Sequence, residues 1–288
     1  RPIIEEYTLE LPGGHIESGQ LPEEAALLEL KEETGYIAKS IELIGIFHPD
    51  AGRLTNKIWS YYTEDIIIKL EESGVDMIEI GLPFSDPLAD GPIIQDSSTQ
   101  AIKNGMNSNV LFDQLKNIRS KVSIPLIIMG YFNPILQYGV EDFCKKCSEI
   151  GIDGLIIPDL PIDYYETNYK SIFKDYGLYN LFLIAPQTPE ERIRHIDKIS
   201  DGFIYMVSSS SVTGSKDSFD SDQLTYFKKI EKMNLSTKRI IGFGIGSKNT
   251  YETATQYSKG AIIGSSFIKN LKSKGLSSIN GFIKSIRD

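Results

Sequence analysis

From residue 66 onward, the sequence alternates short apolar runs with longer amphipathic stretches. The apolar runs are Val75–Ile80, Ile124–Met129, Gly154–Ile157, Leu181–Ile184, Phe203–Val207, Arg239–Phe243 and Ala261–Ile263. One amphipathic stretch between them would turn four apolar side chains to the same side of a helix: Val140, Phe143, Cys147 and Ile150. Continuous apolar strands that alternate with such helices are typical of a parallel sheet covered by helices, so the pattern predicts an α/β fold.

Seven apolar runs are one short of the eight strands that a closed (β/α)8 barrel requires. The remaining strand is predicted at Ile58–Thr63, a stretch rich in β-branched and aromatic residues. It precedes a predicted helix over Asp65–Ser73, which Gly74 would end because glycine readily adopts the left-handed conformation. The sequence therefore predicts a TIM barrel over residues 58–288, preceded by a small separate segment over residues 1–57.

The composition of the chain bears on which partners it can have and does not change the predicted fold. The net charge of −9 and the pI near 5.0 argue against a nucleic-acid partner, which requires clustered Lys and Arg. Neither an apolar run long enough for a membrane span nor a signal peptide is recognisable, so we expect a cytoplasmic protein with no membrane partner. Cys144 and Cys147 are too few for a zinc site, so we expect a reduced, structural pair.

Two carboxylates occupy positions that suit acid/base chemistry. Glu79 ends a short apolar strand, and Asp90 lies in the Pro- and Gly-rich loop that follows. A buried acid at a strand end and a solvated acid in a loop have different environments, which separate their pKa values and suit a general acid/base pair. Without other context, Glu79 is equally a carboxylate at the edge of the core that accepts a backbone N–H, and both interpretations remain open.

The N-terminal segment carries a second set of carboxylates. A Gly-rich loop at residues 11–19 precedes a predicted helix over Pro22–Thr34. Glu29, Glu32 and Glu33 fall near one face of this helix, where their charges repel each other unless a cation neutralises them. Mg²⁺ shared with a pyrophosphate substrate is the natural partner of such a cluster, and a solvated acidic helix face is the alternative.

This segment resembles the Nudix hydrolases. The matching positions are Gly14, Glu29, Leu30, Glu32, Glu33, Gly35 and Tyr36. Two positions depart from the family: Gln20 stands where it has Glu, and Leu28 stands where it has the Arg that orients a metal-binding Glu. Because the resemblance stops near residue 60, it implies a partial Nudix-like segment. Mg²⁺-dependent pyrophosphohydrolysis follows as an alternative function.

A second resemblance covers residues 64–288. Its motifs are Gly74–Gly81, Pro83–Pro92, Met129–Pro134, Pro158–Pro161, Val212–Gly214, Gly242–Ile245 and Gly264–Ser265. They are similar to the alpha subunit of tryptophan synthase. That family cleaves indole-3-glycerol phosphate to indole and glyceraldehyde 3-phosphate in tryptophan biosynthesis. The resemblance implies a lyase that needs no cofactor or metal, and a tryptophan synthase beta subunit as partner in an alpha2-beta2 type complex.

The resemblance also implies roles for individual residues. Glu79 would be the general acid/base, and Asp90 would stabilise the positive charge that develops on the indole nitrogen. Thr213 would bond to Asp90 when a lid closes over the substrate. Asp86 and Asp159 match positions on the face that docks on the beta subunit.

The substrate site is implied by glycines near strand ends and by two aromatic residues. Backbone N–H groups beside glycines suit a phosphate group at this end of a barrel. The implied phosphate-binding residues are Gly214, Gly244, Gly264 and Ser265, and the implied lining of the indole pocket is Tyr205 and Phe243. Taken singly, each glycine is also an ordinary turn residue and each ring an ordinary core residue. A non-catalytic barrel that binds only a phosphate ligand or the beta subunit is therefore a further alternative.

The two resemblances meet at Ile58–Thr63. One strand cannot pair in a Nudix sheet and in the barrel at the same time. We expect it to pair in the barrel, where seven other strands offer most of the apolar area. The Nudix-like segment would then be a loosely packed appendage.

Overall fold

The computed structural model describes residues 20–35, 37–38, 41–47, 58–62, 65–87, 90–208 and 218–288. The chain forms two compact units, residues 1–66 and residues 67–288. The sequence predicted a boundary between residues 57 and 58, whereas the two units of the structure meet between residues 66 and 67.

The N-terminal unit contains the helix α1 (Pro22–Thr34) and the strands β1 (Glu42–Phe47) and β2 (Ile58–Tyr62). Pro22 suits the first position of α1, where its missing N–H leaves no hydrogen bond unmade. Gly35 ends the helix with a left-handed φ of 72°. The bounds predicted for this helix are confirmed.

The strand predicted to begin the barrel pairs in the N-terminal unit instead. β2 runs antiparallel to β1, with Ile58 opposite Phe47 and Tyr62 opposite Glu42. The prediction that this stretch pairs in the barrel is therefore wrong, and Thr63 lies outside the described residues. A nearby partner in the sequence explains the difference, because closing a short loop costs less entropy than pairing across a whole barrel.

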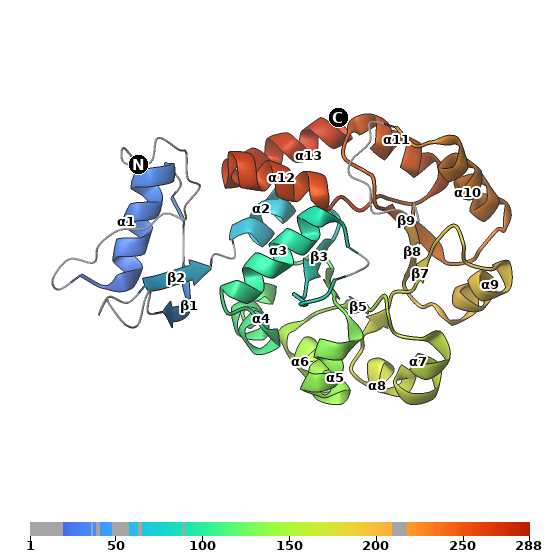
Figure 1. The fold of residues 1–288 in the computed structure, drawn as a ribbon, viewed down its shortest axis with the longest axis horizontal. Helices are drawn as coiled ribbons and strands as arrows, with labels where there is room; N and C mark the ends of the chain where they lie inside the picture. Colours follow the sequence, from blue (N-terminus) through green and yellow to red (C-terminus); the bar gives the residue numbers. More distant parts are fainter. Residues whose placement is uncertain are drawn as a thin grey trace. The chain divides into compact units, whose positions relative to one another are not determined.

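The C-terminal unit is an α/β barrel of the (β/α)8 TIM type (Figure 1). Its strands are β3 (Ile78–Gly81), β4 (Leu126–Met129), β5 (Gly154–Ile156), β6 (Tyr179–Asn180), β7 (Leu183–Ile184), β8 (Phe203–Val207) and β9 (Lys238–Gly242). The first four form one parallel sheet and the last three another. A parallel bridge between Ile241 and Ala261 adds the final strand position.

One short segment joins the two sheets, where the sequence predicted a single strand at Leu181–Ile184. The Leu181 N–H donates to the Leu155 carbonyl on one side (2.9 Å), and the Tyr205 N–H donates to the Phe182 carbonyl on the other (2.9 Å). The wall of the barrel therefore continues through this junction. Among the described residues, no strand lies between β3 and Ala261, where the first strand of a complete barrel would stand.

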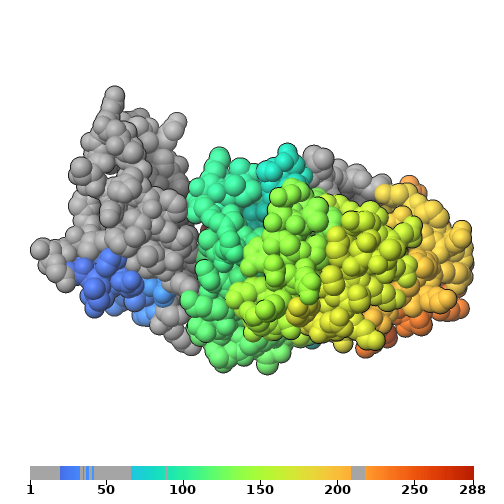
Figure 2. Space-filling model, turned by 90° about the horizontal axis from the view of Figure 1, so that it is seen from below, coloured from blue at the N-terminus to red at the C-terminus, as the bar shows by residue number. Residues whose placement is uncertain are grey.

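Figure 1 shows the helices in a ring around the strands. They are α2 (Asp65–Glu72), α3 (Pro92–Lys103), α4 (Ser108–Leu115), α5 (Phe132–Tyr138), α6 (Val140–Ile150), α7 (Ile162–Asn168), α8 (Lys170–Asp175), α9 (Glu190–Ile199), α10 (Ser221–Lys232), α11 (Lys248–Tyr257), α12 (Ser265–Lys274) and α13 (Ile279–Arg287), with 3-10 turns at Ile118–Ser120 and Leu276–Ser278. Figure 2 shows the green and yellow part of the barrel as a continuous surface. None of the helices in the described ranges is long and apolar enough to cross a membrane.

The core lies in two layers. The larger cluster fills the space between helices and strands, and α6 contributes the four side chains that its sequence predicted. A smaller cluster fills the interior of the barrel: Ile127, Ile156, Leu181, Phe203 and Tyr205. Cys144 and Cys147 are buried and unbonded, as expected for a structural pair.

Candidate active site

Parallel strands place all their carboxyl ends at one end of the barrel. A cavity of about 780 Å³ extends into the barrel interior, and β3, β4, β8 and β9 all contribute to its lining. Seven of the site residues predicted from the sequence line this cavity: Glu79, Asp90, Tyr205, Phe243, Gly244, Gly264 and Ser265. The cavity also reaches the open position of the wall, where Leu70, Ile283 and Ile286 contribute to its lining.

Glu79 reaches the cavity because side chains alternate between the two faces of a strand. It stands opposite Ile127 of β4, a residue of the interior cluster, whereas its neighbour Ile78 belongs to the outer core. The carboxyl group is accessible to water through the cavity and is otherwise enclosed by protein. Loss of hydration, and secondly the charge of Asp90, raise the pKa of Glu79 to about 7.

Asp90 is held by hydrogen bonds on both its backbone and its side chain. Its N–H donates to the Pro87 carbonyl (3.0 Å), and the Gln95 amide donates to its own carbonyl (2.9 Å). The Tyr131 hydroxyl donates to the carboxylate Oδ2 (3.2 Å). Partial burial raises the pKa of Asp90, and the hydrogen bond from Tyr131 opposes this rise by favouring the ionised form.

Tyr205 lies beside both carboxylates. Its side chain is buried, and burial followed by the charges of Glu79 and Asp90 raises the pKa of this phenol. The hydroxyl therefore stays protonated and able to donate a hydrogen bond. The ring fills the place where a side chain on Gly242 would stand, so only glycine fits at that position of β9.

The turn after β9 is strained. Phe243 has a φ of 69°, a left-handed value that is unfavourable for a bulky residue, and Gly244 follows with a φ of 74°. Ser208, fully buried after β8, holds this turn: its hydroxyl donates to the Phe243 carbonyl (2.7 Å) and its N–H donates to the Gly242 carbonyl (3.1 Å). The turn and its backbone groups are thereby fixed at the lining of the cavity.

The helix α12 begins at the cavity. Gly264 precedes its first residue, Ser265, and both line the cavity. The first N–H groups of a helix have no partner within the helix and carry the positive end of its dipole. Together with the turn at Gly244, this helix start can accept an anion such as a phosphate group.

The two predicted partner-face residues lie outside the cavity. Asp86 and Asp159 are exposed. Asp86 accepts a hydrogen bond from the Ser85 hydroxyl (2.6 Å), and Asp159 accepts one from the Phe132 N–H (2.8 Å), which ties the loop after β5 to the start of α5. Their role at an interface stays a prediction. Thr213 and Gly214, predicted to close the pocket, lie outside the described residues.

The predicted carboxylate cluster of α1 is described only in part. Glu29 and Glu32 lie on the helix as predicted, and the side chain of Glu33 is outside the described set. Among the described residues, one group of three possible ligands converges, and it lies on the barrel: Asp163, Glu166 and His195. Because the side chain of Glu33 is outside the described set, the metal site of the Nudix alternative stays a prediction.

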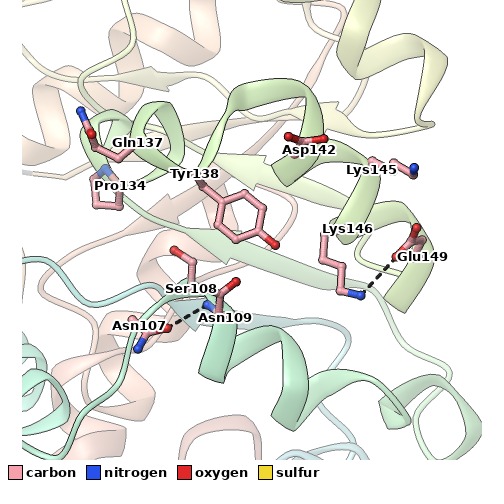
Figure 3. A pocket seen from close by; sticks show the side chains of 10 residues that line it. All are labelled: Asn107, Ser108, Asn109, Pro134, Gln137, Tyr138, Asp142, Lys145, Lys146 and Glu149. Atoms are coloured by element: carbon pink, nitrogen blue, oxygen red, sulfur yellow. Dashed lines mark hydrogen bonds and ion pairs between the residues drawn. The ribbon is translucent and has the colours of Figure 1, made fainter.

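A second hollow, of about 750 Å³, lies on the outside of the barrel beside α4, α5 and α6 (Figure 3). Asn107 caps α4 there, and Lys146 pairs with Glu149 (3.2 Å). None of the predicted site residues lines it. It is therefore a surface feature separate from the candidate active site.

Sequence reasoning missed two residues of the site. Tyr131 and Ser208 come just after β4 and β8, at the end of the barrel where barrels keep their chemistry. That position was the signal available for Tyr131. Ser208 acts by holding the backbone of another strand, and no sequence pattern marks such a contact.

Comparisons with known proteins agree with this geometry. Residues 60–286 match the sequence model of the family described as tryptophan synthase alpha chain. Residues 2–73 match the model of the NUDIX domain, so residues 60–73 are matched by both.

Individual proteins of this family are similar to the chain over most of its length. The tryptophan synthase alpha chain of Flavobacterium psychrophilum is 69% identical over 78% of this chain and 88% of its own, and that of Christiangramia forsetii is 63% identical over 78% and 88%. Among solved structures, the tryptophan synthase alpha subunit of Pyrococcus furiosus superimposes with a TM-score of 0.69 at 30% identity, over 77% of this chain and 90% of that one. Tryptophan synthase of Mycobacterium tuberculosis gives 0.67 at 27% identity, over 77% and 84%.

Proposed function

The chain belongs to the tryptophan synthase alpha chain family, and on that premise we propose that its barrel cleaves indole-3-glycerol phosphate to indole and glyceraldehyde 3-phosphate. One observation carries the assignment to this site. Glu79, Asp90 and Tyr205 meet in a single cavity, close enough for the charges of both carboxylates to act on the Tyr205 phenol.

The reaction needs one proton moved from oxygen to carbon. The Glu79 carboxyl group gives its proton to C3 of the indole ring, and the resulting carboxylate then takes the proton of the hydroxyl group on the adjacent side-chain carbon. The bond between that carbon and C3 breaks, its electron pair restores the aromatic ring, and the hydroxyl carbon leaves as an aldehyde. A pKa of about 7 suits Glu79 to both transfers near neutral pH.

Asp90 and Tyr205 act on the indole ring itself. Protonation at C3 places positive charge on the ring nitrogen, and the ionised Asp90 carboxylate stabilises that charge. The hydrogen bond from Tyr131 holds the Asp90 carboxylate in position and favours its ionised form against the effect of partial burial. The ring of Tyr205, with Phe243 at a centroid distance of 6.3 Å, offers an apolar wall for the indole.

The phosphate end of the substrate is assigned to the start of α12. The N–H groups at Gly264 and Ser265 and the turn at Gly244 supply donors without a charged side chain. This arrangement fixes the substrate at the end remote from the bond that breaks, so that binding energy serves orientation. No cofactor or metal ion takes part in this scheme, which remains a prediction.

The partner assigned to the chain is a tryptophan synthase beta subunit, in an alpha2-beta2 type arrangement. Asp86 and Asp159 are offered as residues of the docking face because both are exposed in loops after β3 and β5, at the end of the barrel where the substrate enters. Indole released at that end could then pass directly to the partner.

The test is release of indole from indole-3-glycerol phosphate by the full-length chain, with and without a beta subunit. Glu79→Gln should lower kcat by about 10²- to 10⁴-fold, the range of a general acid/base. Glu231→Gln, an exposed glutamate on α10, is the matched control and should retain full activity. No indole from a folded, phosphate-binding wild type would instead favour the non-catalytic barrel.

A second candidate function rests on the match of residues 2–73 to the NUDIX domain. It is Mg²⁺-dependent hydrolysis of a substrate such as ADP-ribose by Glu29, Glu32 and Glu33 of α1. Restoring the family residues with Gln20→Glu and Leu28→Arg should raise such an activity, and Glu32→Gln should abolish it. If neither change alters hydrolysis, the segment has no enzymatic role.

A further inference from the structure

Two carboxylates and an imidazole converge on the outside of the barrel, and none of the three lines the cavity of the candidate active site. Asp163 and Glu166 lie one turn apart on α7, and His195 lies on α9. Their ligand atoms all lie within 4.8 Å of one another, and the His195 Nε2 is 2.6 Å from Glu166 Oε2. We propose that these three side chains form a site for a divalent transition-metal ion, such as Zn²⁺ or Co²⁺, that links α7 to α9.

The ligand set fits this class of ion. One imidazole nitrogen with two carboxylate oxygens is within the range that Zn²⁺ and Co²⁺ accept, and the two negative charges balance a divalent cation. Ligand atoms around a tetrahedral ion at Zn–O and Zn–N bond lengths stand about 3.4 Å apart. The three side chains therefore need only small rotations to close around an ion.

Access and competition set the expected strength of binding. The side chains of His195 and Glu166 are 43% and 28% exposed, so water can complete the coordination. Lys170 places its Nζ 4.0 Å from Glu166 Oε1 and competes with an ion for that carboxylate. The site should consequently bind with moderate affinity, and removal of Lys170 should strengthen it.

The position of the cluster gives the ion a structural role. α7 follows β5 in the four-stranded sheet, whereas α9 follows β7 in the three-stranded sheet. On this side of the barrel, the backbone hydrogen bonds of Leu181 and Phe182 join the two sheets. An ion held between α7 and α9 would brace this junction, in a barrel whose described wall is open at another position.

The experiment is calorimetric titration of the metal-free, full-length chain with Zn²⁺, supported by the visible absorption of bound Co²⁺. Acids of α1 can take up metal independently, so the result is read as a difference between variants. His195→Gln should remove one equivalent of Zn²⁺ or weaken its binding by about tenfold or more. Glu191→Gln, an exposed carboxylate on the same helix, should bind as the wild type does.

Two further measurements keep the proposal falsifiable if His195→Gln folds poorly. Lys170→Gln should bind Zn²⁺ about fivefold more tightly, as loss of a competing charge near 4 Å predicts. Zn²⁺ at a hundredfold excess over Kd should raise the wild-type Tm on the order of 5 °C or more, and should not raise that of Asp163→Asn. Stoichiometry and affinity for Zn²⁺ that are the same in the wild type, His195→Gln, Lys170→Gln and Asp163→Asn would overturn the proposal, whatever the outcome for indole release.

Discussion

Glu79 is reached by water and yet is enclosed by the barrel wall, and its chemistry depends on that combination. With a pKa of about 7, the group is partly protonated at neutral pH. Because the proposed reaction begins with a proton given to carbon, kcat/KM for indole release should fall as pH rises through about 7. Stopped assays from pH 5 to 9 measure this profile. A midpoint near the ordinary value of 4.5 would contradict the assignment.

The same residue should make the protein less stable at high pH. A carboxyl group whose pKa is raised on folding contributes stability below its unfolded pKa, and that contribution is lost as pH rises through the folded value of about 7. Glu79→Gln cannot ionise, so its Tm should exceed the wild-type Tm at pH 8, with a smaller difference at pH 5. Thermal unfolding at both pH values checks this, with exposed Glu231→Gln as the control. A lower Tm for Glu79→Gln at pH 8 would show that the ionised carboxylate is stabilised.

Tyr131 positions Asp90 through one hydrogen bond of 3.2 Å. Tyr131→Phe removes the donor and keeps the ring, which stacks on Phe84 at 5.0 Å. The pKa of Asp90 should then rise further, so activity at acidic pH should fall first and kcat near neutral pH should drop by about tenfold. Tyr138→Phe, at the outer hollow, is the control. An unchanged pH profile of activity in Tyr131→Phe would show that the Tyr131 hydroxyl has no effect on the ionisation of Asp90.

At the scale of elements, β9 depends on glycine because Tyr205 of β8 occupies the space beside Gly242. Gly242→Ala must displace that ring, and overpacking of this kind costs about 1–3 kcal/mol. Gly281→Ala is the matched control, because nothing lies within 4 Å of a side chain added there in α13. It should raise stability by about 0.5–1 kcal/mol. Denaturant unfolding measures both, and equal effects would show that the core around Tyr205 adapts.

The sequence predicted most elements but not all of their partners. β8 has the bounds predicted for it, and α6 buries the predicted face. The run at Leu181–Ile184 instead became the junction between two sheets, because its two ends pair with different neighbours. β2 was predicted as a strand and is one, but it pairs with β1. A strand's own pattern sets its conformation and leaves the choice of partner to the rest of the chain.

At the scale of the whole molecule, the cavity residues could be predicted because carboxyl ends of parallel strands always meet at one end. Glu79, Asp90 and Tyr205 come together for that reason. Tyr131 and Ser208 act through contacts between strands, which no single stretch of sequence encodes. Residues 60–73 match both family models, so the sequence does not decide to which unit they belong. The structure shows that β2 belongs to the N-terminal unit and that most of α2 belongs to the barrel.

The described wall of the barrel is open beside β3, and hydrogen exchange can test whether it is open in solution. In β3 and just beyond it, the N–H groups of Ile78 and Leu82 donate toward β4 (3.0 and 2.7 Å). Because donors alternate along a parallel strand, the N–H groups of Glu79 and Gly81 face the position where, among the described residues, no strand lies. These two amides should therefore exchange much faster than those of Ile78 and Leu82. Equal protection of all four amides would show that another segment of the chain closes the barrel, and the proposed lyase reaction would then take place in a closed barrel.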